Sequence, residues 1–225
     1  MPVSRPRFIA DLPEPELEVL CACISPWKAR KGSTVHAEGE AVQALYMLDA
    51  GRMQFEVHAL DGRKLVLGFV GAGRSFGELE VVEGGPALAA AVVNQSASGW
   101  RLSVQDFHAV LAQTPHFAAL MLRTTARNAR IHHRLYRHSL LMSPDERLAL
   151  ALLSIRRHGH ADASPEPAVI QTTQDMLAQM LGTTRQCVSK HLKQWESAGW
   201  IAIQYGGITL LDSEAIAAYV NLDLF

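Results

Sequence analysis

The stretch "TTQDMLAQMLGTTRQCVSKHLKQWESAGWIAI", residues 172–203, is the most informative part of the sequence about the C-terminal fold. Thr172 with Asp175 three residues later is a capping pattern, which predicts a short helix that ends near Leu181. Gly182 then permits the left-handed turn of a tight corner between two helices. The first half of the stretch therefore predicts a short helix followed by a sharp turn.

A second, longer helix follows this turn. Thr183 or Thr184 caps it, and it runs to about Ser197. One face of this helix is apolar at the spacing i, i+4, i+7, and its members are Val188, Leu192 and Trp195. A short helix, a glycine turn and a capped longer helix form a helix-turn-helix.

The other face of the second helix is polar and carries no acid before Glu196. Arginine near the start of such a helix can bind guanine through two hydrogen bonds, and glutamine can do the same for adenine. An ordinary solvated helix is the simpler alternative, but the following "WIAIQYGGITLLD", residues 200–212, predicts the hairpin of a winged helix with its turn at Gly206 and Gly207. The residues expected to contact DNA are Thr173, Thr184, Arg185, Gln186, Ser189, Lys190 and Lys193.

The N-terminal part reads as strands, because from about Val35 to Val93 the hydrophobic period is two. "RMQFEVHAL", residues 52–60, alternates apolar and polar residues, and an Asp61-Gly62 turn leads into "KLVLGFV". This pattern predicts a hairpin with one buried face. Closely spaced glycines between short strands predict an antiparallel β-roll of the jelly-roll kind.

Between the two parts, Pro115 starts a long segment with the period of a helix. Residues of this segment, most of them apolar, recur at spacings of three and four and form a stripe, which favours a coiled coil with a second copy of the chain. Packing of the stripe against the roll of its own chain is the alternative. The residues expected in a dimer interface are Phe117, Met121, Thr124, Asn128, Ile131 and Leu135.

A new helix starts at "SPDERLALALLSI", where Ser143 is a good cap and Pro144 suits the first helical position. The break at 139–143 predicts a hinge, and "RRHGHADASPEPAV", 156–169, predicts a loop. We therefore expect an α+β protein with three parts. These parts are a β-roll sensor domain at 1–114, a dimerisation helix and hinge at 115–142, and a winged helix-turn-helix domain at 143–225.

Composition limits the class of protein. The 225 residues carry a formal net charge of -1, yet positive charge is concentrated between Phe117 and His138 and again from Arg185 to Lys193. One-sided positive faces fit an anionic partner such as double-stranded DNA. No apolar run is long enough to cross a membrane and the N-terminus does not read as an export signal, so we expect a cytoplasmic protein that does not bind membranes.

A roll containing "FGEL", a long helix, a hinge and "LAQMLGTTRQCVSKHLKQWESAGWI" together resemble the Crp/Fnr family of bacterial transcription regulators. The resemblance implies a homodimer that binds a pseudo-palindromic operator, with RNA polymerase as a further partner. It also implies that Arg185 reads guanine and that Lys190 replaces a basic residue. Gln186 stands where the family usually has glutamate, so the operator sequence stays open.

The resemblance to cyclic-nucleotide-binding members holds for one part of the effector site and fails for another. Gly77, Glu78 and Leu79 match the motif whose glutamate holds a ribose hydroxyl in cyclic-nucleotide-binding members. The arginine and the hydroxyl residue that hold the phosphate fall on Leu88 and Ala89. A buried phosphate without a cation is costly, so cyclic AMP in the usual pose is disfavoured. His132 and His133 stand where those members contact the adenine.

Other effectors stay open. An apolar or carboxylated metabolite with Arg123 or Arg127 as counter-ion is one hypothesis, an empty roll is another, and a cyclic-nucleotide regulator with an altered phosphate site is a third. An iron-sulfur cluster is disfavoured because the chain has 3 cysteines, whereas haem stays open because histidines are plentiful. A cupin-like metal enzyme would need clustered ligands, and His36, His58 and Glu78 are dispersed. We therefore expect no metal site, no catalytic residues and no enzyme.

Overall fold

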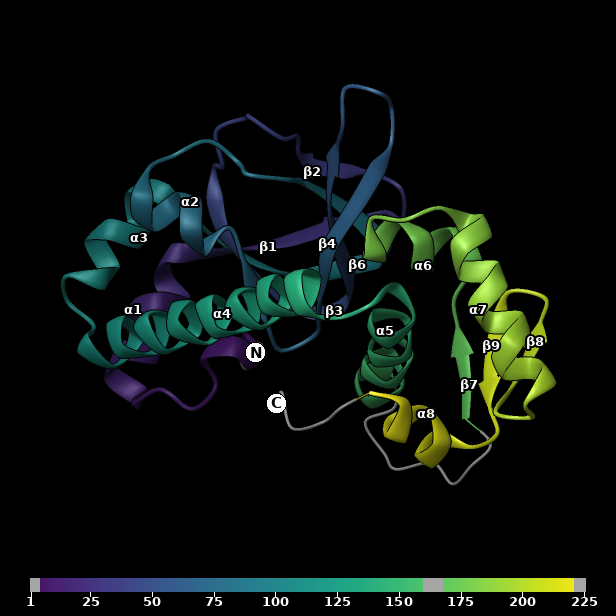
Figure 1. Ribbon diagram of the computed structural model, residues 1–225. Coiled ribbons are helices and arrows are strands. Elements are labelled where there is room, and N and C mark those ends of the chain that lie inside the picture. Colours follow the sequence, from purple (N-terminus) through teal and green to yellow (C-terminus); the bar gives the residue numbers. More distant parts are fainter. Residues whose placement is uncertain (1–4, 160–167, 221–225) are drawn as a thin grey trace. The chain divides into compact units, whose positions relative to one another are not determined.

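The computed structural model describes residues 5–159 and 168–220 (Figure 1). Two compact units make up the chain: Met1–His58 with Leu67–His132, and Ala59–Val66 with His133–Phe225. The division falls inside the long helix α4 rather than at either of its ends. The domain boundaries expected at 114/115 and 142/143 therefore stay predictions. No helix within the described ranges combines the length and apolarity that a membrane crossing needs.

Antiparallel strands form the body of the N-terminal unit, as the period of two predicts. Its sheet has the order β1-β6-β3-β4, while β2 pairs with β6 and β5 pairs with β3. The strands are β1 (Ile24–Ala29), β2 (Thr34–His36), β3 (Ala44–His58), β4 (Lys64–Gly71), β5 (Ser75–Phe76) and β6 (Ala90–Ser103). The helices are the 3-10 turn η1 (Arg7–Ile9), α1 (Glu14–Cys23), α2 (Glu78–Glu83), α3 (Val104–Leu111) and α4 (Pro115–Leu141).

The backbones of the two long paired strands β3 and β6 approach each other closely, and two glycines allow this close approach. A Cβ at Gly99 would lie 2.0 Å from the carbonyl oxygen of Met47, and one at Gly51 would lie 2.4 Å from that of Ser96. The β3–β6 register shifts between Leu48 and Met53, next to these contacts. Bulges at close backbone approaches are how a sheet curls into a roll.

The alternation along β3 predicted one buried face, and this prediction is wrong. Gln54 and Glu56, on the polar side of the pattern, are 4% and 8% exposed. Gln54 donates a hydrogen bond to Glu56 at 2.7 Å and accepts one from Asn94 at 3.2 Å. Polar residues can be buried when such bonds satisfy them, so the strand is covered on both faces in spite of its pattern.

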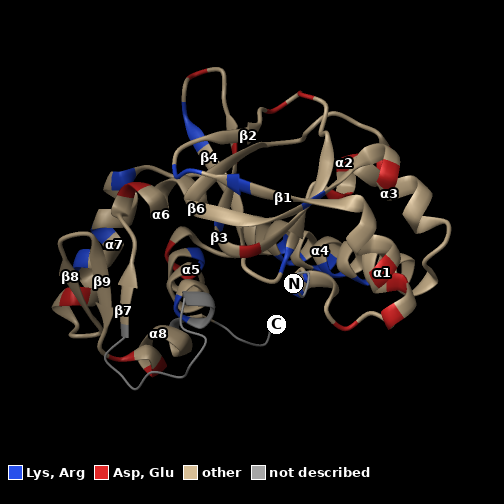
Figure 2. Cartoon of the chain, turned by 180° about the vertical axis from the view of Figure 1, so that it is seen from behind, with Lys and Arg blue, Asp and Glu red and all other residues tan. Residues whose placement is uncertain are grey.

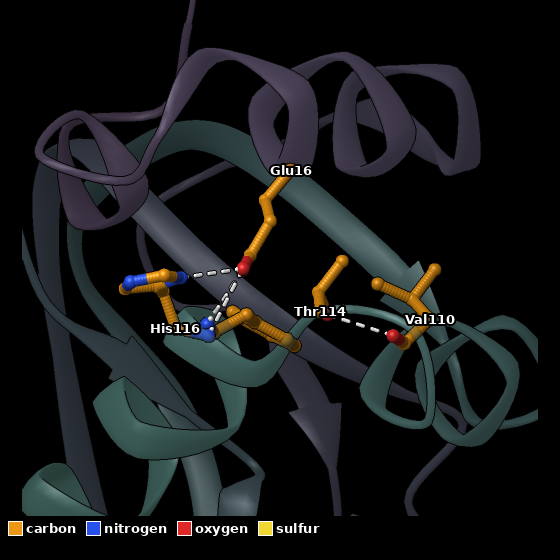
Figure 3. Close-up of polar contacts among 5 residues, drawn as sticks. Glu16, Val110, Thr114 and His116 are labelled. Atoms are coloured by element: carbon orange, nitrogen blue, oxygen red, sulfur yellow. Dashed lines mark hydrogen bonds and ion pairs between the residues drawn. The ribbon is translucent and has the colours of Figure 1, made fainter.

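The start of α4 is held by a buried carboxylate from α1 (Figure 3). Glu16 accepts hydrogen bonds from the backbone N–H groups of His116 at 3.1 Å and Phe117 at 2.9 Å, and its Oε1 lies 2.7 Å from His116 Nδ1. Burial raises the pKa of Glu16, but these hydrogen bonds outweigh it and leave the pKa below its ordinary value. The carboxylate thus acts as a cap from a distant part of the sequence, which no local pattern signals.

The predicted break between the two long helices is present. Helix α4 ends at Leu141, and α5 (Pro144–Gly159) starts after Ser143, whose backbone N–H and hydroxyl both bond Glu146. The loop predicted at 156–169 is wrong at both ends, since α5 continues to Gly159 and strand β7 (Ala168–Gln171) starts before the predicted end of the loop. Residues 160–167 of that prediction lie outside the described residues.

In the described residues of the C-terminal unit, four helices pack with a small sheet of order β7-β9-β8. Its other elements are α6 (Gln174–Leu181), α7 (Arg185–Ser197), β8 (Ile201–Gln204), β9 (Gly207–Leu210) and α8 (Ser213–Tyr219). Val188, Leu192 and Trp195 of α7 are buried in one core with Leu148 of α5 and Ile208 of β9. These elements build the predicted winged helix-turn-helix, with β7 as a third strand that the sequence did not indicate.

Candidate functional site

The corner between α6 and α7 has the geometry of a helix-turn-helix. Thr173, not Thr172, caps α6 and accepts from the Met176 N–H at 3.1 Å. Gly182 takes the left-handed conformation at φ 61°. Thr184 caps α7 and accepts from the Cys187 N–H at 3.2 Å, as one of the two predicted caps. The prediction for Thr172 was wrong by one residue because either hydroxyl fits a capping pattern.

The two faces of α7 differ in exposure as a DNA-reading helix requires. The apolar stripe is buried, while Ser189 is half-buried and the other predicted contact residues are exposed. Lys and Arg are prominent on this helix (Figure 2). The exposed contact residues are Thr173, Thr184, Arg185, Gln186, Lys190 and Lys193. The fold therefore brings together the side chains expected to contact DNA along two helix starts and one helix face.

Two further features of this surface were not predicted from the sequence. Asp175 of α6 lies 3.8 Å from Arg185, with both side chains more than half exposed. Such a pair is worth little and can open when DNA competes for the arginine. Tyr205 stands fully exposed at the wing turn beside Gly206, whose φ is 74°. An exposed aromatic ring at a hairpin tip is a candidate contact to the DNA backbone.

The roll places its "GEL" motif at the junction of β5 and α2. Gly77 has a φ of 85°, and a Cβ there would lie 2.8 Å from the carbonyl oxygen of Ala44. Only glycine fits this position, so the motif is needed for the backbone whatever the roll binds. Leu79 follows on α2 and is half-buried.

Glu78 is the buried acid of this motif, at 6% exposure. Its Oε1 accepts a hydrogen bond from Asn128 of α4 at 2.5 Å, whereas its Oε2 has no partner within the described residues. Burial raises the pKa of Glu78 to about 7, with a smaller effect in the same direction from Glu80. Glu78 thus joins α2 to the long helix through Asn128, and not through an arginine.

The other residues predicted for an effector pocket do not gather around Glu78. Leu88 is 67% exposed, and Ala89, which is buried, offers only a methyl group. Arg123 and Arg127 on α4 are exposed. The prediction of one pocket formed by these residues is therefore not supported by their placement.

The stripe predicted for a dimer interface divides along α4. Phe117 and Met121 are 0% and 3% exposed and pack in the core of their own unit with Phe107, so their assignment to an interface is wrong. Asn128 is engaged with Glu78, and Thr124 is half-buried. The alternative expectation, that the stripe packs against the roll of its own chain, is thus confirmed for the first half of the stripe. Ile131 and Leu135 are nearly half exposed.

Comparisons with known proteins agree with this architecture. The Crp-like helix-turn-helix domain matches residues 146–219, and the cyclic nucleotide-binding domain matches residues 26–114. The chain is 27% identical to a CRP-like cAMP-activated global transcriptional regulator of Mycobacterium tuberculosis, over 86% of this chain and 87% of that protein. It is also 27% identical to the cyclic AMP receptor protein of Thermus thermophilus, over 81% and 82%.

Among solved structures, the c-di-GMP responsive global regulator CLP of Xanthomonas campestris has the same fold. The TM-score is 0.78 at 17% sequence identity, covering 88% of this chain and 99% of that one. A roll that matches a cyclic nucleotide-binding domain, followed by a Crp-like helix-turn-helix, is the domain order of a DNA-binding transcription regulator. The chain belongs to the Crp/Fnr family, whose members are regulators and not enzymes.

Proposed function

We propose that the protein is a cytoplasmic homodimer that binds a pseudo-palindromic operator through α7 and that a small effector other than cyclic AMP controls it. The observation that carries this proposal is the exposed polar face of α7 above its buried apolar face. Two such helices in a dimer fit two half-sites one helical turn apart. RNA polymerase is the expected protein partner, and the break at 139–143 is the expected hinge.

A pair of α7 variants tests the DNA contact. Arg185→Ala should cost about 1–3 kcal/mol and relax preference at one base position, because arginine near the helix start reads a base edge. Lys193→Ala should weaken binding to all sequences alike and reduce the salt dependence, as expected of a phosphate contact. The measurement is fluorescence anisotropy on operators obtained by selection from random DNA.

The matched control is Lys28→Ala, which removes the same charge from an exposed position on β1 of the roll. It should leave operator affinity unchanged. Wild-type affinity and specificity in both α7 variants would show that α7 does not read DNA.

The proposal that the effector is not cyclic AMP is supported by Leu88 and Ala89, which stand where cyclic-nucleotide-binding members hold the phosphate. Leu88 points into solvent and Ala89 offers no donor, while Asn128 already occupies one oxygen of Glu78. Isothermal titration of the full chain should detect no saturable binding of cyclic AMP. Since the matched domain is a cyclic nucleotide-binding one, a regulator with an altered phosphate site is the second candidate, and saturable binding of cyclic AMP would select it.

A further inference from the structure

The N-terminal unit contains a cavity of about 350 Å³ that none of the predicted effector residues lines. Its volume lies in the range of small-molecule sites. It opens beside the segment that joins β2 to β3. The lining residues are Val35, His36, Glu40, Ala41, Gln43 and Tyr46.

His36 is the buried polar group of this cavity. It is 6% exposed, and its Nδ1 has no hydrogen-bond partner within the part of the chain that the structure describes. Its ring centre lies 6.3 Å from that of Phe76. Burial lowers the pKa of His36 in spite of the carboxylates of Glu80 and Glu40, so the imidazole is neutral at pH 7. A buried ring nitrogen without a partner is costly, and a ligand that hydrogen-bonds it would remove that cost.

The remaining polar groups of the cavity belong to Glu40, Gln43 and Tyr46, and each of them offers an acceptor oxygen. Glu40 is exposed at the entrance, and its carboxylate is fixed there by the backbone N–H of Ala37 at 2.8 Å. The amide nitrogen of Gln43 donates to the Ala41 carbonyl at 3.1 Å, which leaves its side-chain oxygen to accept. Within the described residues, no lysine or arginine lines the cavity itself. Glu80 adds a negative charge near His36, and Arg101 places a positive charge near Tyr46.

We infer that this cavity binds a small organic cation, a primary amine whose N–H donates to His36 Nδ1 while the Glu40 carboxylate balances its charge. The inference rests on the proposed function, because such a ligand would be the effector of the roll. A phosphorylated ligand is disfavoured beside His36, because Glu40 lines the cavity there and Glu80 lies near the same ring, and two like charges would oppose its phosphate. The neutral imidazole suits the amine because it can accept a hydrogen bond without repelling the ammonium group.

The experiment is isothermal titration of the full chain with putrescine, with inorganic phosphate and with magnesium chloride, at constant ionic strength. Putrescine should bind saturably and with a stoichiometry of one per chain. His36→Leu and Glu40→Gln should each lower its affinity at least tenfold. The matched control Glu38→Gln, an exposed acid two residues from both, should leave the affinity unchanged.

Circular dichroism and operator binding of the same preparations separate failure of this inference from failure of the proposed function. Folded variants that still bind the operator but lose putrescine support the amine site. Binding of phosphate or magnesium in place of putrescine, no saturable binding of putrescine, or equal loss in Glu38→Gln would each overturn it.

Discussion

Glu78 is a residue whose protonation departs far from its ordinary state. Its carboxyl is buried and bonded on one oxygen by Asn128, so the folded protein holds its proton up to a pKa of about 7. The unfolded chain releases that proton near 4.5. Because the folded pKa is raised, the free energy of unfolding should fall as pH rises from about 4.5 to 7 and then stay level. The total change is at most roughly 3 kcal/mol.

Glu78→Gln tests this at the level of one residue. The amide keeps the shape and the acceptor for Asn128 but carries no charge, so the variant should be more stable than the wild type at pH 8 and nearly equal at pH 4.5. Urea denaturation across this pH range measures it. Glu83→Gln, an exposed acid on the same helix, should show no such difference. The assignment would be contradicted if Glu78→Gln and Glu83→Gln showed the same dependence of stability on pH.

Single residues were predictable from the sequence where the chemistry is local. Thr184 and Ser143 cap the next helix through a bond to a neighbour three residues on, so their patterns are visible in the chain. The partner of Glu78 was not predictable in this way. Asn128 lies 50 residues further on, and nothing local distinguishes an asparagine of a dimer interface from one that bonds a buried acid.

At the level of elements, the anchoring of α4 by Glu16 gives a second prediction. Glu16→Gln removes the negative charge beside two helix N–H groups and His116, so it should lower the melting temperature by several degrees. The pKa of Glu16 is depressed, so its stabilisation is present above the ordinary carboxyl pKa and is lost as pH falls below it. Thermal melts at pH 7 and at pH 3 measure both effects.

Glu18→Gln is the control for this anchor, because Glu18 is an exposed acid on the same helix. It should melt within about a degree of the wild type, as most exposed substitutions do. Equal melting temperatures for Glu16→Gln and the wild type at pH 7 would show that α4 does not need this cap.

The hydrophobic period predicted the helices and strands, but it did not predict which residues cover their faces. The period of two gave the strands of the roll, but it could not show that Gln54 and Glu56 are buried, because their hydrogen bonds come partly from Asn94 on another strand. The period of 3.5 in α4 was detected, yet it is satisfied by Phe117 and Met121 packing on their own unit. An apolar stripe on a helix indicates that another element covers it, but it does not identify that element.

At the level of the whole molecule, the dimer should form on a different face of α4 from the one first expected. Leu122, Tyr136 and Leu140 are 72%, 67% and 65% exposed. Together with exposed Ala126, Ala129 and His133, they recur at steps of four and three residues, alternately one and two positions beyond members of the first stripe. That spacing is typical of the seam of a two-stranded coiled coil, and its alanines would let two helices approach closely.

Leu122→Glu tests this seam, because a carboxylate at its start would be buried against the same group of the second copy. We expect the variant to sediment as a folded monomer. It should bind a full operator far more weakly than the wild-type dimer does, because two α7 helices would no longer be joined. Val82→Glu, which replaces an exposed apolar residue on α2, should remain a dimer. A dimer that survives Leu122→Glu but dissociates in Ile131→Glu would place the interface on the first stripe instead, and a monomeric wild type would remove the basis for a pseudo-palindromic operator.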